Sequence, residues 1–227
     1  MAHDTRVGRL ATASLRTAVL LSLACGDSPT GSGATPRSFD AVANFSSTAN
    51  TSSSTWSYRY KDGLTRDGTY TVISSYGPAG PGAWVPTNPG AWSVGGFVPA
   101  IGVNRTAADA TYEGSNLTWP KGTMLVHPGA NQLVVLSWLS PSGGTAIIEF
   151  SFTDLDATCG NGIAWFVERN DAGATLASGS IPSGGGSDSR SLSGVSVRAG
   201  DRINFVVDPN SDFVCDSTKL TATITTS

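Results

Sequence analysis

Short apolar runs, separated by clusters of Gly, Pro, Ser and Asn, constrain the fold of this chain more than any other feature. Along residues 146–153 the even-numbered positions up to Phe152 are all apolar, which is typical of a strand with one buried face. Residues 132–139 (QLVVLSWL) are almost continuously apolar and predict a strand that is buried on both faces. No segment has convincing helical periodicity. The pattern therefore predicts an all-β protein.

Similar runs recur along residues 39–227 and predict roughly ten or eleven strands. Charged residues make up only 14% of the chain and there are 27 glycines, a composition that suits many tight turns. We expect an antiparallel two-sheet β-sandwich of jelly-roll type. Residues 77–96 contain four prolines, which cannot donate to a central ladder, so this segment is expected to be a structured loop or edge insertion.

The N-terminal residues 1–24 have the order of a signal peptide: basic residues, an apolar run and a small residue before Cys25. The segment 21–25 resembles the cleavage site of bacterial lipoproteins, although Ser22 stands where leucine is usual. This resemblance predicts a lipid anchor at Cys25, a flexible tether over residues 25–38 and attachment to a membrane at the cell surface or in the periplasm. The alternative is an ordinary secretory signal, with a chance cysteine and a secreted product.

The other two cysteines lie in loops rich in Asp, Asn and Gly, Cys159 within residues 154–162 and Cys215 within 208–216. In an exported protein such a pair is expected to form a disulfide. The bond would join residues 56 positions apart and stabilise the fold by about 4 kcal/mol in the chain-entropy model. A free thiol nucleophile is disfavoured because no histidine is near either cysteine in sequence.

A disulfide between these loops would also gather their acidic residues at one end of the sandwich. Calcium prefers hard oxygen ligands from irregular loops, which predicts a calcium site here. Two other interpretations remain open: the carboxylates cap their own turns, or Asp154 and Asp216 form a glycosidase pair. The predicted calcium ligands are Asp154, Asp156, Asp208, Asp212 and Asp216.

Charge and histidine content exclude several classes of site. The formal net charge is −3 and the basic residues are scattered, which argues against nucleic acid as a partner. His127 is the only histidine after the predicted signal peptide, so a multi-histidine metal site is impossible within one chain. Residues 127–129 (HPG) favour a plain turn histidine, and no Gly-x-Ser-x-Gly elbow supplies a serine nucleophile.

Three tryptophans lie among Pro and Gly in irregular segments, whereas Trp138, Trp165 and Trp56 fall in strands and are expected in the core. Large amphipathic rings on loops favour interfaces, and sugar rings stack on flat aromatic faces. The tryptophans in irregular segments therefore predict a glycan-binding platform, formed by Trp84, Trp92, Trp119 and Tyr76. The alternative is that the three tryptophans fill the open edge of the sandwich.

Through the order of several short segments, the chain resembles exported bacterial β-sandwich modules of planctomycete-type and PEP-CTERM-type secreted proteins. These modules are similar to carbohydrate-binding jelly rolls. The resemblance covers most of residues 39–227 and implies a sandwich fold with a polysaccharide or glycan as partner. The segments that carry it are FDAVANF (39–45), WSY (56–58), HPG (127–129), Trp138, FTD (152–154), AGDRINF (199–205) and DST (216–218).

Together these observations favour a surface-anchored, non-catalytic carbohydrate-binding β-sandwich. One alternative is a structural or adhesive cell-surface subunit that self-associates through its strands. Another is a small polysaccharide-degrading enzyme on a jelly-roll scaffold. Sandwiches host all three roles, so the fold class alone does not choose among them.

Overall fold

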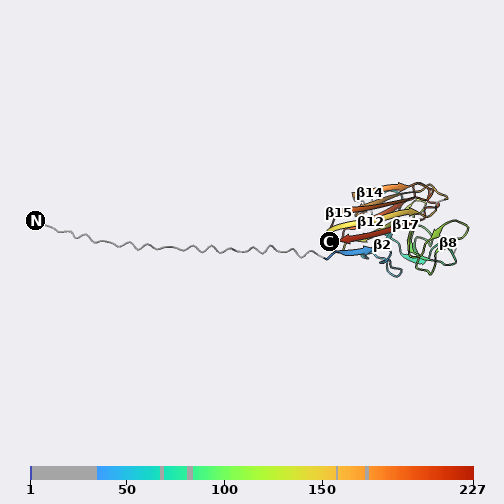
Figure 1. Ribbon diagram of the computed structural model, residues 1–227, viewed down its shortest axis with the longest axis horizontal. Helices are drawn as coiled ribbons and strands as arrows, with labels where there is room; N and C mark the ends of the chain where they lie inside the picture. The colour runs from blue at the N-terminus through green and yellow to red at the C-terminus, as the bar shows by residue number, and fades with distance from the viewer. Residues whose placement is uncertain (2–34, 67–68, 81–83, 157, 172–173) are drawn as a thin grey trace. The chain divides into compact units, whose positions relative to one another are not determined.

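The computed structural model describes Met1 and residues 35–66, 69–80, 84–156, 158–171 and 174–227 (Figure 1). The predicted signal peptide beyond Met1, the predicted lipid anchor Cys25 and the tether up to residue 34 lie outside the described residues. In the described part of the chain, no helix has the length and apolarity needed to cross a membrane.

The larger of two main sheets, sheet A, has eight antiparallel strands. Their order is β15-β12-β17-β10-β7-β6-β4, with β1 also pairing with β17. In chain order the strands are β1 (Arg37–Asp40), β4 (Ser75–Pro78), β6 (Gly90–Ser93), β7 (Ala100–Val103), β10 (Met124–His127), β12 (Gly144–Asp154), β15 (Ser187–Val197) and β17 (Thr218–Thr226).

Sheet B has six antiparallel strands in the order β14-β13-β16-β11-β2-β3, and a small sheet C has the order β5-β8-β9. The strands of sheet B are β2 (Trp56–Asp62), β3 (Thr71–Val72), β11 (Gln132–Leu139), β13 (Ile163–Arg169), β14 (Ala174–Ile181) and β16 (Arg202–Asp208). The strands of sheet C are β5 (Trp84–Val85), β8 (Ala110–Tyr112) and β9 (Thr118–Trp119).

The predicted all-β, antiparallel two-sheet sandwich of jelly-roll type is confirmed. The described residues form 17 strands rather than ten or eleven, because residues 69–127 are divided into many strands of two to four residues. The Pro- and Gly-rich segment 77–96 contains two of these short strands, β5 and β6. Since β6 pairs with both β4 and β7, this segment extends sheet A toward one edge.

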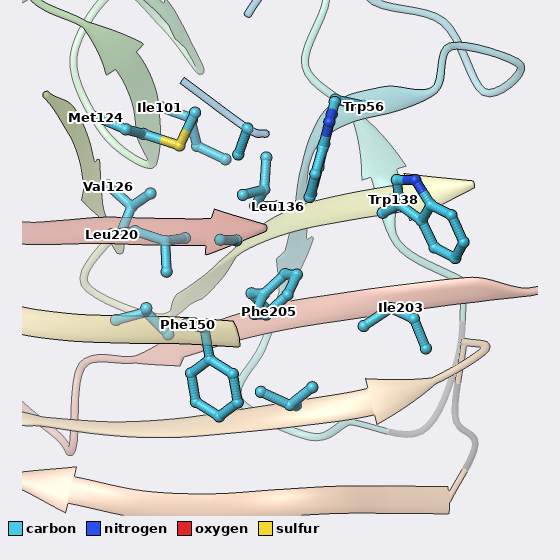
Figure 2. Close-up of a cluster of buried hydrophobic side chains, with 14 of the residues drawn as sticks. Trp56, Ile101, Met124, Val126, Leu136, Trp138, Phe150, Ile203, Phe205 and Leu220 are labelled. Atoms are coloured by element: carbon cyan, nitrogen blue, oxygen red, sulfur yellow. The ribbon is translucent and has the colours of Figure 1, made fainter. Parts of the chain in front are cut away.

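The main hydrophobic core lies between sheets A and B (Figure 2). Phe150 of β12 joins the two sheets, since its ring centroid is 5.5 Å from that of Trp165 and 5.7 Å from that of Phe205. The alternation predicted for residues 146–152 is present: Phe152 is buried, whereas Ile147 on the opposite face is exposed. The strand predicted to be buried on both faces, β11, is buried on both.

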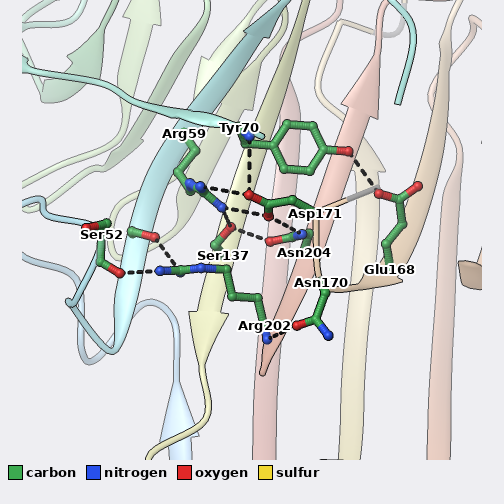
Figure 3. A network of polar contacts seen from close by, with 10 residues as sticks. Ser52, Arg59, Tyr70, Ser137, Glu168, Asn170, Asp171, Arg202 and Asn204 are labelled. Carbon is green, nitrogen blue, oxygen red and sulfur yellow. Dashed lines mark hydrogen bonds and ion pairs between the residues drawn. The ribbon is translucent and has the colours of Figure 1, made fainter. Parts of the chain in front are cut away.

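A second, smaller core covers the outer face of sheet B and includes Leu133 and Val135 of β11 with Tyr70. A polar network lies on the same face (Figure 3). Asp171 accepts two hydrogen bonds from Arg59, at 2.9 and 3.1 Å, and the hydroxyl of Tyr70 donates to Glu168 at 2.9 Å. Burial, followed by the negative charge of Glu168, raises the pKa of Tyr70. The network gives the side chains of Asp171, Glu168 and Tyr70 hydrogen-bond partners, whereas the Nε of Arg59 has none among the described residues.

Candidate functional site

The disulfide between Cys159 and Cys215 is confirmed, with a Cα–Cα distance of 5.7 Å. Cys159 follows the end of β12, and Cys215 precedes β17. A second link between the same loops is the hydrogen bond from Asn161 Nδ2 to the carbonyl oxygen of Asn210, at 2.6 Å. The two loops therefore lie together at one end of the sandwich, as the sequence predicted.

Pairing between β12 and β17 brings the acidic residues together. Asp154 is the register partner of Thr218, and the backbone of Leu155 donates to Ser217 at 2.9 Å. Continuing this antiparallel register places Asp156 opposite Asp216. Asp154 lies two residues before Asp156, so in an extended chain the two side chains point to the same side.

Four of the five aspartates accept hydrogen bonds from backbone N–H groups. Asp154 accepts from Asp156 and Gly185, and Asp156 accepts from Ser217 at 2.8 Å. Asp208 accepts from Asn210, and Asp212 accepts from Val214. Three of these bonds span two residues, as in turns closed by an Asp side chain. The turn-capping interpretation therefore accounts for Asp154, Asp208 and Asp212, whereas Asp156 links the two disulfide loops through Ser217.

Asp216 is the exception. It is 1% exposed, and neither carboxyl oxygen has a hydrogen-bond partner among the described residues. Burial raises its pKa to about 8, and the negative charges of the other four aspartates add to the shift, led by Asp212. The structure therefore gathers all five predicted acids around one buried carboxyl group.

Next to the disulfide lies a cavity of about 330 Å³ with mostly apolar walls. Sheet C supplies one wall through Trp84, Tyr112 and Trp119. The remaining walls come from the disulfide loops, from β10 and from residues between Ala79 and Ala100, and the two largest exposed side chains in the lining are Phe97 and Val214. The other lining residues are Ala79, Gly80, Ala91, Val98, Ala100, Ser115, Leu117, Leu125, His127, Asp156, Phe213, Cys215 and Ser217.

A second, more polar cavity of about 370 Å³ shares Ser115, Leu117 and Asp156 with the first. Its lining also includes Asn116 and Thr158. Since the two cavities share lining residues, they are adjacent. An apolar hollow therefore lies beside a polar one.

The expectation of exposed, flat tryptophan faces is wrong. Trp84 is 7% exposed, Trp92 is 6% exposed and Trp119 is 0% exposed. Trp84 meets Trp119 at an interplanar angle of 62°, so the two rings form no common plane. Trp84 and Trp119 are buried in the hydrophobic cluster around sheet C, in agreement with the alternative that the tryptophans fill the edge of the sandwich.

The fourth residue of the predicted platform is Tyr76, which is 40% exposed. Its ring meets that of Trp92 edge to face, 5.4 Å apart. Trp92 belongs to the main core and its indole N–H donates to the carbonyl of Ser46 at 2.7 Å. Neither residue lines the cavity that contains Trp84 and Trp119. The four aromatic residues thus fall into two separate pairs.

The cavity also has hydrogen-bonding groups, and one of them is His127. Its Nδ1 is 2.7 Å from the carbonyl oxygen of Pro128. Because a carbonyl can only accept, Nδ1 carries the proton and Nε2 is left as an acceptor. Burial lowers the pKa of His127, which favours the neutral ring. The sequence favoured a plain turn histidine. The position of His127 in the cavity depends on the long-range pairing of β10.

Asp156 supplies a second acceptor. Its Oδ2 receives the Ser217 N–H, while no hydrogen bond within the described residues uses Oδ1. His127 and Asp156 both line the cavity, which therefore combines aromatic and aliphatic walls with two residues that have acceptor atoms. Such a site suits a ligand with apolar faces and hydroxyl or amine donors, and the adjacent acids disfavour an anionic one.

No model of a protein family matches this chain, and no curated protein matches it significantly. Several solved structures are similar to it. The C-terminal CBM6 of LamC, a marine laminarinase from Zobellia galactanivorans, is 16% identical over 43% of this chain and 81% of its own, with a TM-score of 0.24.

A mutant of the family 29 carbohydrate-binding module CBM29-2 is 19% identical over 70% of this chain and 92% of its own, with a TM-score of 0.30. The β-(1,4)-mannanase GH26-CBM35 of Podospora anserina is 12% identical, with a TM-score of 0.30. That match spans 75% of this chain but only 28% of the mannanase. With TM-scores this low, the matches carry no argument about function.

Proposed function

We propose that this protein is a carbohydrate-binding β-sandwich whose site is the cavity beside the disulfide. The observation that carries the proposal is that aromatic walls and two residues with acceptor atoms, His127 and Asp156, line the same cavity. Sugar rings have apolar C–H faces that contact aromatic side chains, and hydroxyl groups that donate to fixed acceptors. The nearby negative charges favour a neutral glycan over an acidic one.

Binding without cleavage fits this geometry best. Glycosidases need two carboxyl groups that flank the scissile bond. Asp216, one of the two candidate acids, is buried with both oxygens inaccessible, so it cannot reach a polysaccharide. We therefore expect no release of reducing sugar from any polysaccharide that the protein binds.

The test is isothermal titration against a panel of neutral and acidic oligosaccharides, with two matched variants. Phe97 lines the cavity and is 47% exposed, so Phe97→Ala removes ligand contact with little cost to folding. Tyr76→Ala truncates a similarly exposed aromatic residue outside the cavity. We expect Phe97→Ala to weaken binding about tenfold, corresponding to about 1.4 kcal/mol, and Tyr76→Ala to leave it unchanged.

Other outcomes of this titration contradict the proposal. Loss of binding in Tyr76→Ala alone would return the site to the region of Tyr76 and Trp92. Binding of no oligosaccharide, together with concentration-dependent oligomers, would favour the structural or adhesive subunit. Preference for acidic glycans would contradict the argument from charge.

We also propose that the protein is exported and anchored to a membrane through a lipid on Cys25. The disulfide supports export, since such bonds persist in oxidising compartments. The lipoprotein-like segment 21–25 and the resemblance to exported planctomycete-type and PEP-CTERM-type modules support it as well. Labelling of cells with an alkyne fatty acid tests the anchor: the wild type is expected to take up label and Cys25→Ala to lose it. Export without label would indicate the ordinary secretory signal.

A further inference from the structure

The apolar cavity beside the disulfide is lined both by exposed and by fully buried side chains. Phe97 and Val214 are 47% and 51% exposed, and we refer to these two residues as the rim. Trp119, Leu125 and Ala100 line the same cavity and are at most 7% exposed, and we refer to them as the inner wall. All three belong to the hydrophobic cluster around sheet C. The cavity therefore reaches from the surface into a hydrophobic core.

The inner wall suits a sugar ring poorly. A pyranose ring carries hydroxyl groups on most of its carbon atoms, and each hydroxyl that is buried without a partner costs about 1–3 kcal/mol. Leu125 and Ala100 have no polar atom in their side chains. The indole N–H of Trp119 is already used, since it donates to the carbonyl oxygen of Thr123 at 3.0 Å. The inner wall therefore favours a chemical group that has no hydroxyls.

Polar side chains gather instead where the second cavity adjoins the first. Asp156 lines both cavities, and its Oδ1 accepts no hydrogen bond within the described residues. Asn116 and Thr158 line the second cavity and are exposed, so their side chains are open to hydroxyl groups of a ligand. The two adjacent cavities thus differ in the chemistry that each accepts, and Asp156 marks their junction.

The apolar cavity has room for a group of several carbon atoms. Its volume is about 330 Å³, whereas an apolar cavity of about 150 Å³ is enough to bind benzene. Water binds weakly in an apolar cavity, so an apolar group that enters gains contact with the aromatic walls at little cost. The volume allows an aryl ring or a short acyl chain.

We propose that the glycan unit bound at this site carries an apolar substituent, an aryl or acyl group, which enters the apolar cavity. The sugar ring lies at the junction of the two cavities, where it donates a hydroxyl group to Asp156 and contacts the rim at Phe97. The substituent packs against the inner wall, next to Trp119 and Leu125. This inference rests on the proposed function and adds the chemical class of glycan that the site selects.

The test compares ligands that share a sugar and differ in the substituent, by isothermal titration of the oxidised protein. The probes are the methyl glycosides of glucose, galactose, mannose and xylose, the phenyl glycoside of each, and an O-butanoyl ester of each methyl glycoside. We expect the phenyl or the butanoyl derivative to bind about tenfold more tightly, or better, than the methyl glycoside of the same sugar. Its heat-capacity change should also be more negative, since more apolar surface is buried. The two derivatives distinguish an aryl from an acyl substituent.

The outcomes separate this inference from the proposed function. Binding of plain glycosides or oligosaccharides with no gain from either substituent would overturn the inference and leave the proposed function intact. Phenol is the control for the substituent alone: if it binds as tightly as the phenyl glycosides, the sugar adds nothing and the proposed function is contradicted. Binding of none of these ligands would contradict both.

Cavity variants locate the substituent. Ala100→Leu fills part of the inner wall, so it is expected to abolish the preference for the substituted ligand. Ala164→Leu is its control, because Ala164 of β13 is half-buried and outside the cavity.

A second pair of variants answers the same question if Ala100→Leu fails to fold. Val98 is half-buried and lines the apolar cavity, and Val98→Thr adds a hydroxyl group with little change of shape. This variant is expected to reduce the preference for the substituted ligand. Val94→Thr, at a half-buried position outside the cavity, should keep it. An unchanged preference in every folded cavity variant would overturn the placement of the substituent.

Discussion

At the scale of single residues, the buried polar groups are the most distinctive feature of this chain. On the outer face of sheet B, Tyr70 donates to Glu168 and Arg59 pairs with Asp171, although the Nε of Arg59 has no hydrogen-bond partner among the described residues. At the disulfide end, neither carboxyl oxygen of Asp216 has a hydrogen-bond partner among the described residues. The contacts on sheet B are explained by folding, whereas Asp216 lacks a group that would balance a buried charge.

Tyr70→Phe tests the first explanation. Removal of the hydroxyl leaves a buried oxygen of Glu168 without this donor, so the free energy of unfolding should fall by about 1–3 kcal/mol. Urea denaturation measures the change. Tyr60→Phe is the control, because the half-buried Tyr60 hydroxyl makes no hydrogen bond among the described residues. An equal loss of stability in both variants would show that the hydrogen bond from Tyr70 to Glu168 adds nothing to the free energy of unfolding.

The pH dependence of stability tests the environment of Asp216 in metal-free buffer. Its folded-state pKa is raised from 3.8 to about 8, so between these values the native state holds a proton that the unfolded state releases. The contribution of Asp216 to the free energy of unfolding should therefore decrease as pH rises across this range. Comparing urea denaturation at several pH values, we expect Asp216→Asn to remove this decrease and Asp62→Asn to keep it. The same slope in all three proteins would contradict the assignment.

At the scale of elements, the short strands between residues 69 and 127 determine where the cavity forms. Gly102 of β7 is one residue that this arrangement requires. A Cβ atom there would lie 2.6 Å from the carbonyl oxygen of Gly90 in β6 and 2.8 Å from the ring of Trp119. The absence of a side chain at Gly102 thus lets sheet A approach the aromatic wall.

Gly102→Ala is expected to lower the free energy of unfolding by about 1–3 kcal/mol through overpacking. Gly77→Ala is the matched control on β4, where an added Cβ has no atom within 4 Å. Thermal unfolding of the two variants measures the difference. Equal melting temperatures would mean that β6, β7 and β9 adjust more easily than this packing implies.

Sequence reasoning succeeded at this scale where the signal is local. The alternation that ends at Phe152, the continuous apolar run of β11 and the pairing of Cys159 with Cys215 were all predicted correctly. The burial of Trp84 was not, because Pro- and Gly-rich surroundings resemble those of an exposed loop. Its burial depends on sheet C and on Tyr112, and strands of two or three residues leave almost no periodic signal. His127 was missed as a cavity residue because its position depends on the long-range pairing of β10 with β7 and β17.

At the scale of the whole molecule, the disulfide joins the loops that hold both the acidic cluster and one wall of the cavity. Replacing both cysteines by serine should lower the free energy of unfolding by up to about 4 kcal/mol. It should also weaken glycan binding, because the disulfide loops, which form one wall of the cavity, would no longer be held together. Urea denaturation and glycan titration of the double variant measure both effects. Full retention of glycan affinity would show that β12–β17 pairing alone positions this wall.

The central claim is that a glycan binds in the cavity beside this disulfide. Its most direct test follows the six indole N–H signals in a ¹H–¹⁵N NMR spectrum during titration with a neutral oligosaccharide that the protein binds. We predict that the signals of Trp84 and Trp119 shift in proportion to occupancy, while those of Trp138 and Trp165 in the main core stay in place. A shift of Trp92 with no change at Trp84 or Trp119 would contradict the claim.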